Sequence, residues 1–280
     1  MPGLVCAVHQ PNFFPRLSTL AKLYAADVWV ILDNVQFTRR DYQNRCYLPD
    51  AGAALPARWL TLPVHLPDGR ATLIHDARLA DPELTARRVR GMLRQYFAAS
   101  PHRAAIQGLL AEAEEACTSS ARLAEASERT TVALLEAVRW RGRICRSSDL
   151  TARPGRSERL ADLTISAGAT AYLCGTGGSR YLDPAPFTAQ GLAVQFFTPP
   201  SRLAGLHPDA CRRATALADL AEAGPRALAR HLDRHAAAWR NSLHVLPQHG
   251  PQALAIGQRP GTAPGASPAL TGRADGEYRA

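Results

Sequence analysis

The fold is decided by the stretch Val5–Asp33, VCAVHQPNFFPRLSTLAKLYAADVWVILD. Its first apolar run, Val5–Val8, predicts a buried strand, and Leu17–Ala25 has the spacing and the preceding proline that are typical of a helix. The β-branched and aromatic run Val28–Leu32 predicts a second strand. A strand, a helix and a strand within about 30 residues indicate a βαβ unit whose two strands are parallel.

Each of these two strands ends in polar residues. The first runs into HQPNFFP (His9–Pro15), and the second runs into Asp33. Because parallel strands point their carboxyl ends to the same edge of a sheet, we expect His9 and Asp33 to be neighbours on that edge. Pro11 and Pro15 fix φ at two points and would hold the polar side chains between them at a lower entropic cost.

The remaining periodicity extends the α/β pattern into an α/β fold with a mixed sheet, a βαβ opening unit and a central helical segment. Further strands are predicted at Arg45–Leu48, Arg58–Val64, Thr72–Ala77, Arg143–Ser147, Ala171–Cys174 and Val194–Thr198. Helices are predicted at Arg156–Ala167, at Asp209–Arg240 and, three of them, within Asp81–Trp140, with breaks at Ser100-Pro101 and Thr118–Ser120. We expect one domain over residues 1–246, with lobes of about 1–80 and 141–246 around a helical insert at 81–140, and a disordered Gly/Pro-rich tail at 247–280.

Composition restricts the class of protein. The 280 residues are 46% hydrophobic, enough for one sizeable core, and no run approaches the roughly 18 to 20 apolar residues of a membrane span. The N-terminus lacks a signal-peptide pattern and the six cysteines form no C-x-x-C pair, which favours the cytoplasm.

The net charge of +9 comes almost entirely from arginine, since Lys22 is the only lysine. No aromatics interleave the arginine clusters, so we expect no nucleic-acid partner. Because no apolar run is long enough to span a bilayer, we also expect no membrane partner.

The first group of residues that could carry chemistry follows the two opening strands. Amides and arginines are dense there, and this combination suits recognition of a polar, anionic small molecule, free or bound to a carrier. The predicted substrate-binding residues are Gln10, Asn12, Gln36, Arg39, Arg40, Gln43, Asn44 and Arg45. His9 oriented by Asp33 would be a general base, whereas the alternative is that both side chains only cap loop amides.

The second group is ATAYLCGTGGSRYLDP, Ala169–Pro184, in which a strand ends at Cys174 and enters a glycine-rich loop. Such a loop can surround an oxyanion, and Cys174 would be a nucleophile if its thiol were exposed beside a base; a buried structural cysteine is the alternative. The glycines match neither the dinucleotide nor the P-loop fingerprint, so we expect no cofactor. His231 and His235 share one helix face but lack the glutamate of a zinc protease, so an exposed helix face is favoured there.

Two segments carry a resemblance to a known family. HQPNFFPRL…ADVWVILDNVQFTRRDYQNR resembles the opening of the WbqC-like family, whose members read HQPxYxPW, then D[DN]VQF, a basic pair and QNR. SERLADLTISAGATAYLCGTGGSRYLD is similar to the family's second block. The resemblance implies a protein of surface-sugar or specialised-metabolite assembly, with site residues at His9, Gln10, Pro11, Asn12, Asp33, Gln36, Gln43, Asn44, Arg45, Arg159, Gly175, Tyr181 and Asp183.

The chain departs from the family pattern at several positions. Cys174 stands where serine is more common, and Arg16 stands where tryptophan is usual. The late helix of the family is matched only loosely by Ala214–Gly224. The C-terminal lobe is therefore the part of the chain in which the function is most expected to differ from that of other family members.

Three functions are compatible with the sequence. The first is a transferase that moves an acyl or aminoacyl group to an amine of a sugar or amino acid, with His9, Asp33 and Cys174 as catalytic residues. The second is a non-catalytic ligand-binding or scaffold protein of the same pathway. The third is a metal-dependent hydrolase that uses His9, Asp33 and either His65 or His75, although we expect no metal site.

Overall fold

The computed structural model describes residues 3–51, 55–201 and 213–245. The chain divides into a compact unit, Met1–His244, and a second unit, Val245–Ala280. The tail predicted at 247–280 lies outside the described residues. Across the described residues, no helix combines the length and apolarity that crossing a bilayer requires.

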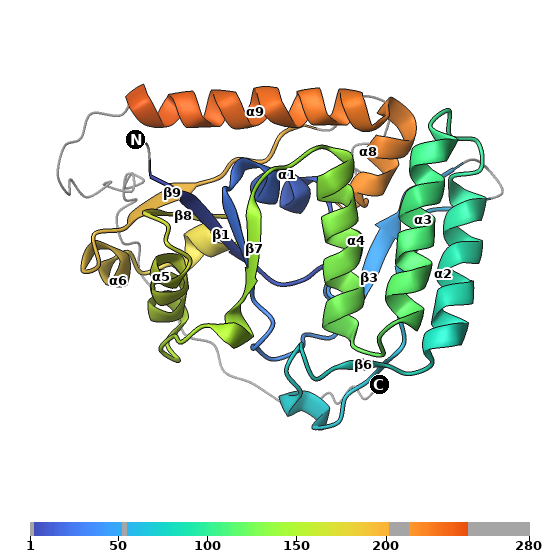
Figure 1. The fold of residues 1–280 in the computed structure, drawn as a ribbon, viewed down its shortest axis with the longest axis horizontal. Coiled ribbons are helices and arrows are strands. Elements are labelled where there is room, and N and C mark those ends of the chain that lie inside the picture. Colours follow the sequence, from blue (N-terminus) through green and yellow to red (C-terminus); the bar gives the residue numbers. More distant parts are fainter. Residues whose placement is uncertain (1–2, 52–54, 202–212, 246–280) are drawn as a thin grey trace, which may run out of the picture. The chain divides into compact units, whose positions relative to one another are not determined.

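A five-stranded sheet, parallel throughout, forms the centre of the first unit (Figure 1). Its strands lie in the order β7-β2-β1-β8-β9. Their bounds are β1 Val5–His9, β2 Val28–Ile31, β7 Arg143–Arg146, β8 Ala171–Cys174 and β9 Ala193–Phe196. The chain adds β2 and β7 on one side of β1 and then returns to add β8 and β9 on the other. The strand order thus reverses between β1 and β8, and in open parallel sheets ligands bind outside the carboxyl ends of the strands at such a reversal.

The alternation of side chains along these buried strands divides the core between the two faces of the sheet. Ala7 and Ile31 pack on one face, in the large cluster that includes residues of α1. Cys6 and Val30 pack on the other face, with residues of α5. Strands buried on both faces have the near-continuous apolar sequences seen here, as expected for a parallel sheet between layers of helices.

Helices and two small antiparallel ladders complete the unit. The helices are α1 Leu17–Ala25, α2 Pro82–Tyr96, α3 Arg103–Thr118, α4 Leu123–Ala137, α5 Arg156–Ser166, α6 Ala185–Thr188, α8 Ala216–Ala223 and α9 Pro225–Val245. The ladders pair β3 (Arg45–Leu48) with β4 (Arg58–Thr61) and β5 (Val64–His65) with β6 (Arg78–Leu79). The α/β class, the βαβ opening unit and the three central helices are therefore confirmed, with antiparallel pairing confined to the two separate ladders.

Three predicted elements differ from the structure. The strand predicted at Arg58–Val64 is two strands, because Pro63 between them cannot donate to a ladder. The strand predicted at Thr72–Ala77 is wrong: Phe37 N donates to Thr72 O, and Ile74 N and His75 N donate to carbonyls of the loop after β2. In the helical segment Asp209–Arg240, Gly224 with a φ of +83° and Pro225 separate α8 from α9, and residues 209–212 lie outside the described part.

Candidate functional site

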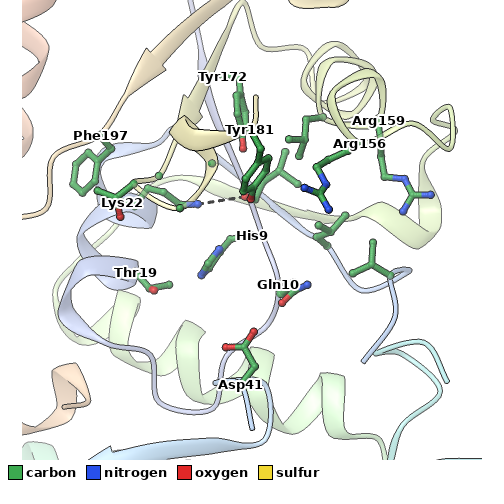
Figure 2. Close-up of a pocket in the computed structure, with 18 of the residues that line it drawn as sticks. His9, Gln10, Thr19, Lys22, Asp41, Arg156, Arg159, Tyr172, Tyr181 and Phe197 are labelled. Carbon is green, nitrogen blue, oxygen red and sulfur yellow. Dashed lines mark hydrogen bonds between the residues drawn. The ribbon is translucent and has the colours of Figure 1, made fainter. Parts of the chain in front are cut away.

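A cavity of about 710 Å³ lies at the carboxyl ends of β1 and β8, where the strand order reverses (Figure 2). Six segments line it: the end of β1, helix α1, the loop after β2, the start of α5, the glycine loop after β8 and the segment after β9. The polar lining residues are His9, Gln10, Arg16, Ser18, Thr19, Lys22, Gln36, Asp41, Arg156, Arg159, Tyr172, Thr176 and Tyr181. Some residues predicted at the edge of the first two strands thus line a cavity to which α1, α5 and β8 also contribute.

His9 is the last residue of β1, and its imidazole faces the cavity (Figure 2). Its backbone carbonyl accepts hydrogen bonds from Leu32 N and from Trp29 Nε1, which fix the strand end in place. The imidazole Nε2 is buried without a hydrogen-bond partner. Burial, followed by the positive charges of Lys22 and Arg16, holds the pKa of His9 well below its ordinary value. His9 is therefore a neutral imidazole at physiological pH.

Lys22 lies on α1, and its side chain is only 6% exposed. The Nζ atom donates to the Val8 carbonyl over 3.3 Å (Figure 2). Burial lowers the pKa of the Lys22 amine to about 8, so about a tenth of this amine is uncharged at pH 7 and about half at pH 8. Sequence reasoning missed Lys22 as a site residue, although one signal was available: it is the only lysine among 33 basic residues.

Arginines make the cavity wall cationic. Arg159 and Arg156 come from the first turn of α5, and Arg156 lies over the Tyr181 ring at 4.6 Å. Arg16 precedes α1 and lies over the Tyr42 ring at 4.2 Å. Among the described residues that line the cavity, Asp41 supplies the only carboxylate. This imbalance of charge favours an anionic ligand.

Six of the residues predicted for the site line the cavity, namely His9, Gln10, Gln36, Arg159, Gly175 and Tyr181. Gln43 supports one of them from behind, because its Nε2 donates to Gln10 Oε1 over 2.8 Å while its own side chain is fully buried. The sequence therefore located the main segments of the cavity wall but not the cationic residues Arg16 and Arg156.

Asp33 follows β2 as predicted, but its carboxylate does not orient His9. It accepts hydrogen bonds from Ser147 Oγ (2.9 Å), from Ser148 N (3.0 Å) and from Ser148 Oγ (2.8 Å). Asp33 N also donates to Ile31 O, and this tight turn directs the residue toward the end of β7. Asp33 lines a second cavity, of about 410 Å³, with His75 and Glu128. The expected dyad is thus corrected: Asp33 fastens the loop after β2 to the loop after β7.

Cys174 is fully buried in the core cluster on the α5 face of the sheet. Its Sγ lies under the glycine loop, 2.6 Å from the position that a Cβ would take at Gly178. Burial raises the pKa of the Cys174 thiol, and the nearby positive charge of Lys22 only partly opposes that shift. This environment favours the thiol, whereas a nucleophilic role requires an exposed thiolate.

The histidines of the metal-hydrolase hypothesis are separated in the structure. His65 is exposed on β5, and His75 lies in the second cavity, where its Nε2 is 3.2 Å from Asp76. Within the described ranges, no group of three histidine, cysteine or acidic side chains is placed to hold a metal ion. His231 and His235 contact the carbonyl oxygens of Ser201 and Thr198, over 2.8 and 2.6 Å.

Comparison with known proteins identifies the family. The family model described as "WbqC-like protein family" matches residues 10–203, which is more than half of the chain. The chain belongs to the WbqC-like protein family. It is also 27% identical over 193 residues to "Uncharacterized protein Rv1507c" of Mycobacterium tuberculosis (strain ATCC 25618 / H37Rv), a match covering 68% of this chain and 80% of that protein. No solved structure matches the chain.

Several WbqC-like motif residues lie behind the cavity wall and hold its segments together. The Asn12 carbonyl accepts a hydrogen bond from Thr131 of α4 over 2.7 Å, and the Gln43 carbonyl accepts one from Ser127 of the same helix over 2.6 Å. Asn44 Nδ2 donates to Leu62 O over 2.9 Å. These parts of the WbqC-like motifs therefore fasten the loops to α4 and to the residue that follows β4 rather than line the cavity.

The other charged residues predicted from the WbqC-like motifs also lie outside the cavity lining. Arg45 places its guanidinium 3.9 Å from the Trp59 ring centroid and donates to the Arg40 carbonyl. Arg39 and Arg40 are exposed. Asp183 accepts from Ala185 N, an arrangement typical of a residue just before a helix. In place of Arg39, Arg40 and Arg45, the cavity presents Arg16, Arg156 and Arg159.

Proposed function

We propose that this WbqC-like protein is a biosynthetic transferase that moves an acyl or aminoacyl group to an amine of a sugar or amino acid. The pathway would be the assembly of a surface polysaccharide or a specialised metabolite, and the substrate would be a small molecule, free or bound to a carrier. The observation that supports the proposal is an uncharged imidazole, His9, with an unpartnered Nε2, facing a cationic cavity at the reversal of strand order. A neutral imidazole can take up a proton from a reacting amine, and the arginines can hold the anionic part of a substrate.

The reaction would proceed by attack of the amine nitrogen on the acyl carbonyl carbon. The carbonyl electron pair moves to oxygen, and the resulting oxyanion faces the loop Gly175–Gly178, where three glycines permit close approach of the backbone. His9 takes a proton from the attacking nitrogen and passes it to the leaving group as the carbonyl re-forms. The products are an amide and the protonated leaving group.

A non-catalytic ligand-binding protein is the second candidate, and one observation favours it. The carboxylate that would orient the imidazole of a catalytic pair, Asp33, is bound instead to Ser147 and Ser148. The same cavity could then recognise an anionic ligand without converting it. The two candidates predict different outcomes for the bound ligand. A transferase would add an acyl or aminoacyl group and so raise its mass, whereas a ligand-binding protein would leave its mass unchanged.

An extract of a strain that lacks the gene provides the test. We expect an amine-bearing intermediate to accumulate there, and addition of the purified protein to convert it to a product heavier by one acyl or aminoacyl group, as read by mass spectrometry. His9→Asn should lower the rate on the order of 100-fold or more. Arg94→Ala, on the exposed face of α2, is the matched control and should keep the full rate. Binding of the intermediate without any gain in mass would refute the transferase and favour the ligand-binding protein.

A further inference from the structure

The position of Lys22 is unusual for a lysine. Helix α1 carries it on the face that packs against the sheet, since its Nζ donates to the Val8 carbonyl of β1, and the residue is buried. Its amine nevertheless reaches the cavity, between the end of β1 and the glycine loop (Figure 2). A Cβ at Gly175 would lie 3.8 Å from Nζ, so the absence of a side chain there leaves room beside the amine.

Apart from the Val8 carbonyl that accepts from Nζ, the surroundings of Lys22 do little to stabilise a positive charge. The groups with a favourable charge interaction are Cys174 and Cys6, and both help the ammonium only as thiolates. Burial raises the pKa of Cys6 to about 12 and also raises that of Cys174, so both are neutral thiols near pH 7. The titratable and charged groups that share the cavity or contact Lys22 are Cys6 and His9 of β1, Tyr172 and Cys174 of β8, Arg16 beside α1, Arg156 and Arg159 of α5, Asp41 and Tyr181.

We infer that Lys22 is the catalytic base that removes a proton from the ammonium form of the acceptor, so that the acceptor enters the cavity as a primary ammonium ion. The inference rests on the proposed transferase, because only an acceptor amine needs this deprotonation. Its basis is the placement of a single buried amine at the cavity wall, anchored through one hydrogen bond to Val8 O.

Two protons must leave the acceptor nitrogen, and Lys22 and His9 each take one of them. The ammonium of the acceptor gives one proton to Lys22, which becomes an ammonium, and the free amine then attacks the acyl carbon. The second proton leaves the attacking nitrogen through His9 and departs with the leaving group. Lys22 finally releases its proton to water, which restores the uncharged amine.

His9 is poorly suited to the first of these steps. Its pKa lies well below the ordinary value, so it is far too weak a base to take a proton from an alkylammonium ion. An amine with a pKa of about 8 lies much nearer than His9 to the pKa of an alkylammonium ion, about 10, and is therefore the better base for this step. Anion binding alone does not require a lysine here, since Arg16, Arg156 and Arg159 already supply cationic groups.

The single lysine allows a direct test of its charge. Protein labelled with 15N-lysine has one lysine side-chain resonance, and we expect its chemical shift to titrate with a midpoint near pH 8. A midpoint above about pH 10, the ordinary value for lysine, would overturn the inference whatever reaction the protein catalyses. The backbone signals of Lys22 at the same pH values show whether the fold is intact.

Three variants of Lys22 separate a base from a fixed positive charge. We expect Lys22→Arg and Lys22→Met each to lower the rate of acylation of the accumulated amine by 100-fold or more, and ethylamine to restore part of the rate in Lys22→Ala. The rate of the unaltered protein should rise with pH up to about pH 8 and then level off, and Lys22→Arg should lose this dependence. Full activity of Lys22→Arg would overturn the inference. Failure of the proposed function is distinguishable, because the unaltered protein would then form no acylated product.

Discussion

Burial acts on three residues around the cavity in a consistent way, by penalising whichever protonation state is charged. It holds the pKa of His9 well below its ordinary value, lowers the pKa of Lys22 to about 8, and keeps Cys174 as a thiol. The charge of the site that does not depend on pH comes from guanidinium groups, which do not lose their protons in proteins. In a site of this kind, the arginines recognise the anionic part of the substrate, whereas His9 and Lys22 transfer protons.

The role of Asp33 can be tested at the same scale. Because its carboxylate accepts three hydrogen bonds from Ser147 and Ser148, Asp33→Asn should lower the free energy of unfolding by about 1–3 kcal/mol. The rate of group transfer should stay within a few-fold, since the carboxylate does not hold His9. Denaturant titration and the mass assay measure the two effects, with the exposed Asp68→Asn as the control. A loss of rate as large as that of His9→Asn, at unchanged stability, would instead restore Asp33 as a catalytic partner.

At the scale of elements, the sequence predicted local structure where the pattern of apolar residues was strong. Helix α1, strand β3 and strand β8 have the predicted bounds. The segment Thr72–Ala77 was mispredicted because its backbone pairs with a loop that is distant in the sequence, and no local pattern records such a partner. Lys22 was missed for a related reason: a lysine on a helix is usually solvent-exposed, and only the packing of α1 on the sheet buries this one.

The glycine loop after β8 gives a prediction at the element scale. A Cβ at Gly178 would lie 2.6 Å from Cys174 Sγ, whereas none of the described atoms lies within 4 Å of one at Gly177. Gly178→Ala should therefore lower the free energy of unfolding by about 1–3 kcal/mol, and Gly177→Ala should not. Adding Cys174→Ala to Gly178→Ala should recover most of the loss, because the colliding sulfur is removed. Equal effects of the two glycine substitutions in thermal unfolding would contradict this packing.

For the whole molecule, the order of the strands in the sheet, more than their number, determines where the cavity forms. The reversal between β1 and β8 brings together residues far apart in the chain, among them His9, Lys22, Arg159 and Gly175. The sequence predicted the strands and placed polar residues at their ends, but it did not contain the order in which β7, β8 and β9 join the sheet. The candidate site was therefore predictable only in part. The segments beside β1 were predicted from the sequence, whereas the contribution of α1 could be recognised only from the assembled fold.

The central claim is that chemistry takes place in the cavity between the ends of β1 and β8. The most direct test is a crystal structure of the protein with the amine-bearing intermediate isolated from the strain that lacks the gene. We predict that the intermediate occupies this cavity, with its amine within hydrogen-bond distance of Lys22 Nζ and its anionic part against Arg156 or Arg159. An intermediate bound elsewhere, for example in the second cavity beside Asp33, would contradict the claim.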